Sequence, residues 1–326
     1  MSLSKVTCEL CPRHCKLAEG QSGFCFIRQN LQGQLTNISY GKVCALAIDP
    51  IEKKPLYHFY PGSKALSLGT LGCNMGCKFC QNWHISKSRQ GSELGHELSP
   101  AKLIQLAKYY NCLSCAFTYN EPIIWYDYAL DCARKCHEAG IKTIAVTAAY
   151  INPKYRHTFF ESMDGVNIDL KSFNPDFYRR FCAADLNVIK DNIKYVRHQT
   201  KCHLELTTLL IPGLNDSPQE IEAAAKWIRD ELGADLPWHL SGFHPAYKLT
   251  DPQPTPAQTL KRARAQALGL GLHHVYIGNV PDDEGQNTYC SKCHALLIER
   301  AYNSVIANNL DLDCCPKCHK RLAGIH

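Results

Sequence analysis

Residues 72–82 read Gly-Cys73-Asn-Met-Gly-Cys77-Lys-Phe79-Cys80-Gln-Asn, a C-x3-C-x2-C pattern with an aromatic residue directly before the last cysteine. Three thiolates at this spacing can bind three irons of one [4Fe–4S] cluster and leave the fourth iron without a protein ligand. We therefore expect Cys73, Cys77 and Cys80 to hold a cluster whose open iron accepts a small molecule. A zinc site and three incidental buried thiols are the competing interpretations.

The chain has 326 residues and 19 cysteines. Its N-terminus, MSLSKVTCELCPRHCK, contains no apolar run typical of a secretory signal. We therefore interpret the clustered cysteines as metal ligands in a reducing cytoplasm rather than as disulfides. No stretch approaches the roughly 18 consecutive apolar residues of a membrane-spanning helix. The formal net charge of +6 permits a nucleic-acid partner without requiring one.

Between Ala65 and Gly278, short apolar runs alternate with helical periodicities. This order implies parallel β-α-β units with right-handed crossovers. We predict strands at 65–71, 114–118, 142–147, 165–170, 203–210, 236–243 and 273–277, and helices at 100–110, 123–139, 153–161, 188–199, 218–232 and 256–268. The fold class is therefore α/β, a partial (β/α)6-type barrel with its active-site groups at the C-terminal ends of the strands.

The alternation predicts three parts: a cysteine-rich N-terminal extension at 1–64, the barrel at 65–278, and a C-terminal segment at 279–326. Several predicted helices begin with a polar residue followed by proline, an arrangement in which the polar side chain is expected to cap the helix. These polar residues are Ser99, Asn152, Ser217 and Thr255.

The N-terminal extension contains four cysteines, Cys8-x2-Cys11-x3-Cys15-x9-Cys25. A segment of about 25 residues without an apolar core of its own needs such a staple. Four thiolates suit tetrahedral zinc, which we place first, or a second iron–sulfur cluster.

The C-terminal segment contains two C-x2-C pairs, Cys290-x2-Cys293 and Cys315-Pro-Lys-Cys318. Paired knuckles at this separation are typical of zinc ribbons, and a rubredoxin-like iron uses the same spacing. We favour zinc and take Cys314 as the spare cysteine. The cysteines outside the three sets lie mostly in apolar segments and are predicted to be small buried hydrophobes. They are Cys44, Cys112, Cys115, Cys132, Cys136, Cys182 and Cys202.

The triplet resembles the signature of the radical S-adenosylmethionine (SAM) enzymes, in which the amino and carboxylate groups of SAM chelate the open iron. The resemblance implies that one low-potential electron, from an external donor, cleaves the S–C5′ bond of SAM. Methionine and a 5′-deoxyadenosyl radical result, and the radical abstracts hydrogen from a substrate. Initiation requires no side-chain general base, so we assign no catalytic side chain.

Further motifs resemble SAM contacts of this superfamily. Asn120-Glu121-Pro122 resembles a Gly-Gly-Glu-Pro-like motif whose carboxylate binds the SAM ammonium, although Asn120 replaces a glycine. Asp169-Leu-Lys171 resembles a motif of glycyl-radical activating enzymes in which the lysine lies near the SAM carboxylate. The resemblance implies cofactor binding by these residues, with Phe79 beside the cluster. A helix-end charge for Glu121 and a simple ion pair for Asp169 and Lys171 are the alternatives.

His244, in Gly-Phe-His-Pro, matches the place where the same activating enzymes have a histidine near SAM, and a surface position is the alternative. The longer pattern, read from Cys8 to Val280, resembles the AmmeMemoRadiSam-system radical SAM enzymes, a branch near the pyruvate formate-lyase activating enzymes. This resemblance implies AMMECR-domain and Memo-domain partners by association and supplies no substrate. The stretch Lys53 to His58 either lines the cleft mouth or caps a strand.

The leading hypothesis is a radical SAM enzyme that activates or modifies a protein. Radical modification of a nucleic acid or a metabolite is the alternative within the same chemistry. A non-catalytic, zinc-containing nucleic-acid-binding protein would need a concentrated basic face, which the sequence does not show. An electron-transfer protein would need a fourth cysteine near the triplet, and none is apparent from the sequence.

Overall fold

The computed structural model describes residues 5–88, 95–282 and 284–326. Its centre is an eight-stranded sheet in the order β14-β13-β12-β11-β10-β9-β7-β6. All neighbours are parallel except β6 and β7, which pair antiparallel. The strands are β6 (Ala45–Pro50), β7 (Lys64–Gly69), β9 (Ser114–Phe117), β10 (Lys142–Thr147), β11 (Gly165–Asp169), β12 (His203–Leu210), β13 (Trp238–Gly242) and β14 (Val275–Gly278). The sheet confirms the predicted α/β fold.

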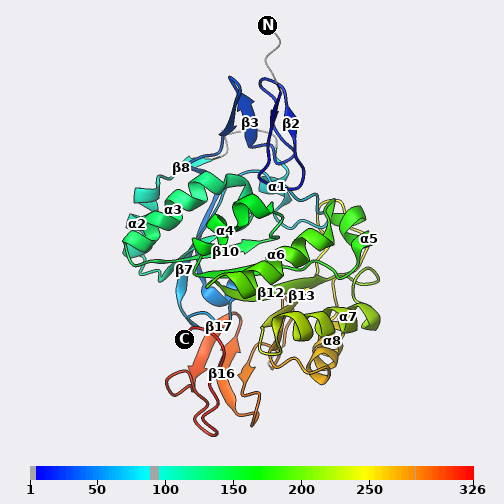
Figure 1. The fold of residues 1–326 in the computed structure, drawn as a ribbon. Helices are drawn as coiled ribbons and strands as arrows, with labels where there is room; N and C mark the ends of the chain where they lie inside the picture. The colour runs from blue at the N-terminus through cyan, green and yellow to red at the C-terminus, as the bar shows by residue number, and fades with distance from the viewer. Residues whose placement is uncertain (1–4, 89–94, 283) are drawn as a thin grey trace.

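Helices cover the outer face of this curved sheet (Figure 1). They are α2 (Pro100–Tyr109), α3 (Tyr126–Glu138), α4 (Pro153–Glu161), α6 (Leu186–Gln199), α7 (Pro218–Trp227) and α8 (Ala257–Gly269), with the short α1 (Trp83–Ser86) and α5 (Pro175–Phe177). Two 3-10 helices, η1 (Ile51–Lys53) and η3 (Pro122–Trp125), follow β6 and precede α3, respectively. Two π-helices, η4 (Tyr178–Cys182) and η5 (Ile228–Leu232), continue α5 and α7. None of the helices in the described residues is long and apolar enough to cross a membrane.

Two of the four predicted helix caps are present in the structure. Ser99 and Ser217 accept a hydrogen bond from a backbone N–H in the first turn of α2 and α7, as predicted. The prediction was wrong for Asn152, whose side-chain amide donates to the Glu9 carbonyl at 2.6 Å. It was also wrong for Thr255, whose hydroxyl bonds two strand ends instead. Both side chains form hydrogen bonds with residues distant in the sequence instead of capping their own helices.

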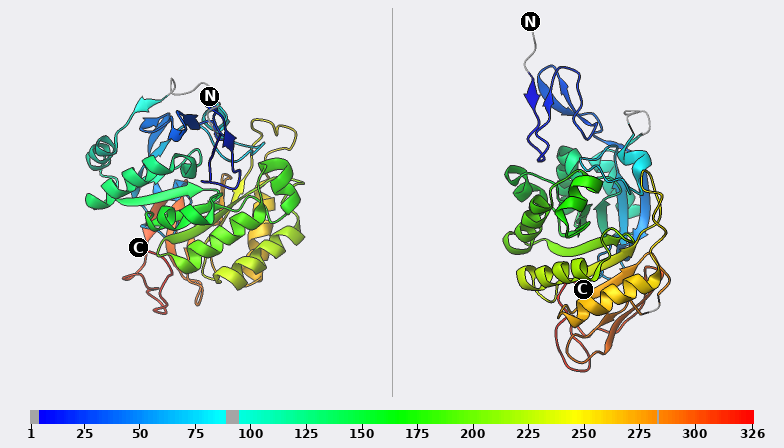
Figure 2. Two further views of the ribbon diagram at one scale, coloured as in Figure 1. Left: turned by 45° about the horizontal axis from the view of Figure 1, so that its top comes forward. Right: turned by 90° about the vertical axis from the view of Figure 1, so that its right-hand side faces the viewer.

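Two small appendages lie at opposite ends of the sheet (Figures 1 and 2). The N-terminal one contains the antiparallel pairs β1 (Val6–Thr7) with β2 (Lys16–Leu17) and β3 (Arg28–Leu31) with β4 (Gln34–Asn37). The C-terminal one is a three-stranded sheet of β15 (Thr288–Tyr289), β16 (Leu296–Ala301) and β17 (Ser304–Asn308). A further short pair joins β5 (Lys42–Val43) to β8 (His96–Glu97). Strand β6 lies within the predicted N-terminal extension but pairs as an edge strand of the main sheet. The predicted domain boundaries at 64 and 278 stay predictions.

The buried Glu205 lies near the N-terminal end of β12, where its carboxylate binds the segment before β7. Its carboxylate accepts the backbone N–H of Tyr57 at 3.0 Å and of His58 at 2.7 Å, together with ring nitrogens of His203 and His239. Each carboxylate oxygen therefore has two hydrogen-bond partners, as a buried charge requires. The segment before β7 thus caps strand ends, and the alternative of a cleft mouth is wrong.

Candidate functional site

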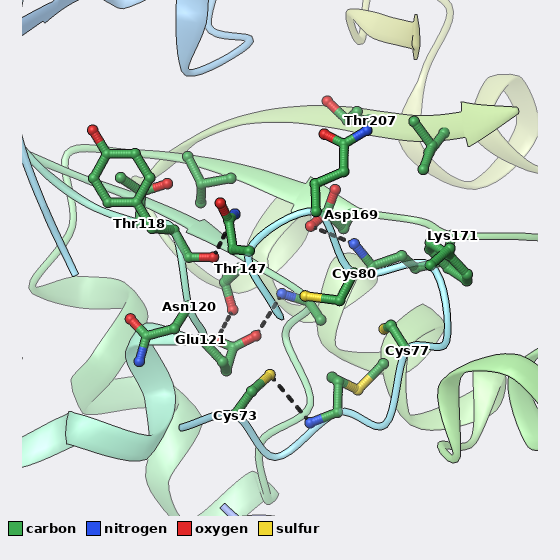
Figure 3. A pocket seen from close by; sticks show the side chains of 18 of the residues that line it. Cys73, Cys77, Cys80, Thr118, Asn120, Glu121, Thr147, Asp169, Lys171 and Thr207 are labelled. Carbon is green, nitrogen blue, oxygen red and sulfur yellow. Dashed lines mark hydrogen bonds and ion pairs between the residues drawn. The ribbon is translucent and has the colours of Figure 1, made fainter. Parts of the chain in front are cut away.

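One pocket lies where the C-terminal ends of the parallel strands converge (Figure 3). The cysteine loop that follows β7 forms one side of it, and groups from β9 to β14 form the rest. Its lining includes the residues predicted for cluster and cofactor binding, Cys73, Cys77, Phe79, Cys80, Asn120, Glu121, Asp169 and Lys171. His244 does not line it and lies exposed after β13. The predicted roles of all these residues stay predictions, but three separate stretches of the sequence bring eight predicted positions into one cavity.

Contacts at two glycines fix the backbone conformation of the cysteine loop. Gly72 has a φ of +81°, and a Cβ added there would lie 2.0 Å from the carbonyl oxygen of Cys25, so a side chain has no room. The N–H of Gly76 donates to the carbonyl of Cys182 at 2.7 Å. Glycine at 72 thus lets the loop pack against the N-terminal extension, while the second contact ties it to the turn after α5.

The thiols on this loop are placed to act as metal ligands. Cys73 Sγ accepts the backbone N–H of Met75 at 3.3 Å, and Cys80 accepts that of Asn82. Burial raises the pKa of the Cys73 thiol to about 12, so a bare thiolate there is unfavourable. A bound metal supplies the positive charge that offsets this cost. Backbone N–H groups directed at buried sulfurs fit an iron–sulfur cluster.

Glu121 follows β9 and points into the pocket beside the cysteines. Its carboxylate accepts the backbone N–H of Ala148 at 2.8 Å, that of Ile123 at 3.3 Å, and the Thr147 hydroxyl. Burial raises its pKa to about 7, although these hydrogen bonds partly oppose the shift. Glu121 therefore caps η3 and also presents a carboxyl group that a cationic ligand would ionise.

Asp169 and Lys171 form an ion pair of 2.7 Å at the end of β11. Burial opposes the charged lysine, but the Asp169 carboxylate and the Cys77 thiol outweigh it and raise the Lys171 pKa. Lys171 is therefore a fixed positive charge in the pocket, partly neutralised by its neighbour.

A hydroxyl without a partner points to a missing polar ligand. Thr207 on β12 lines the pocket, and its Oγ1 is buried with no hydrogen-bond partner among the described residues. Such buried polar atoms are uncommon in native proteins unless a ligand or water satisfies them. Ser241 and Asn279, which the sequence did not single out, line the same pocket. Their positions at successive strand ends were the signal that could have found them.

Cys182 is the clearest feature that the sequence missed. It is buried in the core, as predicted, and its thiol lies beside that of Cys77. A fourth cysteine therefore lies beside the triplet in the folded chain. Cys182 lies on η4, about a hundred residues away in sequence, so no local spacing could reveal it. It does not line the pocket, which leaves the triplet open on the side of Glu121 and Lys171.

The C-terminal cysteine set is compact enough for one metal ion. The sulfurs of Cys290, Cys293, Cys315 and Cys318 all lie within 4.8 Å of one another. Two of the Sγ–Sγ distances are 3.5 Å, close to the roughly 3.8 Å that a tetrahedron with Zn–S bonds of about 2.3 Å implies. This cluster can bind a metal, with Cys314 outside it as predicted.

Comparisons with known proteins agree with this geometry. The sequence model described as "Radical SAM superfamily" matches residues 68–228. The chain is 42% identical over 321 residues to an uncharacterized protein of Methanocaldococcus jannaschii, covering 98% of this chain and 95% of that protein. It is 25% identical over 184 residues to the pyruvate formate-lyase-activating enzyme of Clostridium pasteurianum, covering 55% of this chain and 76% of that enzyme. A radical SAM methyltransferase from Sphaerobacter thermophilus shares the fold, with a TM-score of 0.53, 16% identity and coverage of 67% of each chain.

Proposed function

Because this chain belongs to the radical SAM superfamily, we propose that Cys73, Cys77 and Cys80 bind a [4Fe–4S] cluster and that SAM occupies the adjoining pocket. When bound, the cluster supplies one electron to SAM, whose S–C5′ bond breaks to give methionine and a 5′-deoxyadenosyl radical that takes hydrogen from a substrate. The observation that carries this proposal is the convergence of the three thiols with a carboxyl, an ammonium and an unpartnered hydroxyl in one cavity.

Two charged groups suit the two charged ends of SAM's amino-acid part. The Glu121 carboxylate would accept hydrogen bonds from the SAM ammonium, and Lys171 would face its carboxylate. Asp169 holds the Lys171 ammonium in place through the ion pair of 2.7 Å. The Thr207 hydroxyl provides one more polar contact in the same cavity. Opposite charges at fixed positions orient a zwitterionic ligand in one direction.

Asn120 supports the cysteine loop rather than the ligand directly. Its amide donates to the carbonyls of Leu71 and Gly72, each at 3.0 Å, and its Oδ1 accepts the N–H of Thr70 at 3.0 Å. Phe79 packs against Phe177 with ring centroids 5.7 Å apart. These contacts fix the backbone that carries the three thiols and so keep the sulfurs in position.

The substrate that we propose is a protein. Activating enzymes are among the relatives, including a putative glycyl-radical enzyme activating enzyme. Trp83 follows the pocket-lining Asn82 and stacks on Tyr247, with ring centroids 5.8 Å apart and Trp83 47% exposed. The neighbouring N–H of Lys248 donates to the carbonyl of Lys78 at 2.9 Å, which fastens this loop to the cysteine loop. Exposed aromatic groups of this kind are enriched where proteins bind proteins.

The proposal includes three further components. A low-potential one-electron donor must reduce the cluster, AMMECR-domain and Memo-domain proteins are candidate partners by resemblance, and zinc is the metal proposed for the C-terminal cysteines. The experiment combines the reduced holoprotein, SAM and a deuterated partner protein under anaerobic conditions. Deuterium in the recovered deoxyadenosine would support a protein substrate. Transfer only from a deuterated nucleic acid or metabolite would refute it, and the Cys73→Ala, Cys77→Ala, Cys80→Ala variant provides the control.

A further inference from the structure

The four N-terminal cysteines, Cys8, Cys11, Cys15 and Cys25, line a second, smaller pocket. The hairpin of β1 and β2 brings the first three together, with the N–H of Cys8 donating to the carbonyl of Cys15 at 2.9 Å. Cys25 joins them from the turn before β3. All four are unpaired thiols, and three of them are buried. The site therefore brings together four sulfur ligands from one short segment.

Backbone N–H groups lie beside each of these sulfurs. Cys15 Sγ accepts the backbone N–H of Phe24 at 3.5 Å. Backbone N–H groups two or three residues further along the chain lie beside the other three sulfurs, those of Leu10, Arg13, and Ile27 and Arg28. Hydrogen bonds of this kind stabilise a metal-bound thiolate. In the triplet they reach Cys73 and Cys80, and in the C-terminal set they reach Cys290 and Cys315. Apolar packing alone would not align peptide N–H groups with all four sulfurs.

The spacing of the sulfurs separates two kinds of metal site. A single zinc ion needs four sulfurs roughly 3.8 Å apart, because each Zn–S bond is about 2.3 Å. Among the described residues, the C-terminal set meets a limit of 4.8 Å between all its sulfurs, whereas neither the N-terminal set nor the triplet does. In an iron–sulfur cluster each thiolate binds a different iron, so the sulfurs stand further apart. The N-terminal set is wide like the triplet rather than compact like the C-terminal set.

We propose that Cys8, Cys11, Cys15 and Cys25 bind a second [4Fe–4S] cluster, one with no open iron. This replaces zinc, which the sequence alone had favoured. The Arg28 guanidinium lines the pocket and is held by the carbonyl of Ile124 at 2.8 Å and by Asp127 at 2.6 Å. It offsets part of the negative charge that four thiolates bring.

The N-terminal cysteine site lies directly against the cysteine triplet. The Cys25 carbonyl packs against Gly72, and Asn74, which lies within the cysteine triplet, lines the second pocket. The Arg13 guanidinium donates to the carbonyls of Asn74 and Ala183, each at 2.6 Å. Each cysteine set therefore contributes backbone to the surroundings of the other, so that two redox-active clusters would lie next to each other at the same end of the sheet.

The test is metal analysis of the full chain, reconstituted anaerobically with iron, sulfide and zinc. Two clusters and a zinc ribbon predict about eight irons and about one zinc per chain. The Cys73→Ala, Cys77→Ala, Cys80→Ala variant should retain about four irons, with the Mössbauer doublet of a [4Fe–4S] cluster that has four thiolate ligands. The Cys11→Ser, Cys25→Ser variant should also retain about four irons with unchanged zinc. The spare cysteine gives the matched control, since Cys314→Ser should change neither metal.

About four irons and about two zincs in the wild-type chain would overturn the inference, as would a triplet variant that contains no iron. Neither result depends on the folding of the N-terminal variant. The inference is also independent of the proposed reaction. A protein with about eight irons that never cleaves SAM would refute the reaction and leave the second cluster in place.

Discussion

Glu121 shows how one buried carboxyl group can serve both the fold and a ligand. Three hydrogen-bond donors hold it, yet burial still raises its pKa to about 7, with the Asp169 carboxylate adding to the shift. At neutral pH the group is therefore partly protonated in the free protein. A ligand ammonium would favour the ionised form, because opposite charges attract strongly in a buried site.

We predict that Glu121→Gln weakens SAM binding to the cluster-loaded protein by tenfold to a hundredfold, because a hydrogen bond to a charged group is worth about 1.5–3 kcal/mol. The wild-type dissociation constant should rise as the pH falls through about 7, since the carboxyl must lose its proton before the ammonium binds. Equilibrium titration of SAM at a pH of about 8 and about 6 measures both effects. A wild-type affinity that does not change with pH, or a variant that keeps the pH dependence, would contradict this role.

At the scale of elements, the sequence predicted regular structure well because each strand and helix carries its own local pattern. The strands β10 and β12 and the helix α4 have the predicted bounds, and most others differ by one to three residues. The helix predicted at 218–232 is divided into α7, which ends at Trp227, and the π-helical η5, which continues to Leu232. Loops were harder, because their partners come from elsewhere in the chain. Thr255 and Asn152 bond distant carbonyls rather than their own helices, and Cys182 meets Cys77 only after folding.

The cysteine loop offers a matched pair of substitutions. Gly72→Ala should displace the loop, because its Cβ would lie 2.0 Å from the Cys25 carbonyl oxygen. Gly140→Ala meets nothing within 4 Å at a similar φ of +73°, so it should cost only the backbone strain of about 1–2 kcal/mol. We expect Gly72→Ala to lose iron and to lower the Tm much further than Gly140→Ala. Equal iron content and equal Tm in the two variants would show that the contact with Cys25 does not hold the loop.

In the molecule as a whole, the two ends of the sheet carry different kinds of cysteine site. The pocket and both wide cysteine sets lie at the C-terminal ends of the strands. The compact cysteine set lies at the other end, on a sheet that packs against the segment before β7 (Figure 1). The three cysteine sets could be read from sequence spacing. The sequence could not predict that the N-terminal cysteines and the triplet lie against each other, because Gly72 and Cys25 come into contact only in the folded chain.

The C-terminal sheet is fastened to the barrel by a buried arginine. Arg300 donates to the Tyr57 carbonyl and the Thr288 hydroxyl, each at 2.8 Å, and lies 3.4 Å from the buried Glu52 carboxylate. Arg300→Met should lower the free energy of unfolding by about 3–5 kcal/mol, because it leaves Glu52 buried without a counter-charge. Adding Glu52→Gln should recover part of the loss, as measured by denaturant unfolding. A single variant as stable as the wild type would show that the ion pair does not secure this sheet.

We expect the pocket beside Cys73, Cys77 and Cys80 to cleave SAM. The most direct measurement is chromatographic detection of 5′-deoxyadenosine after anaerobic reconstitution, reduction with dithionite and addition of SAM. We predict slow formation of deoxyadenosine and methionine in equal amounts, abolished in the Cys73→Ala, Cys77→Ala, Cys80→Ala variant. A reduced protein with a full complement of iron that neither binds SAM nor forms deoxyadenosine would contradict the account.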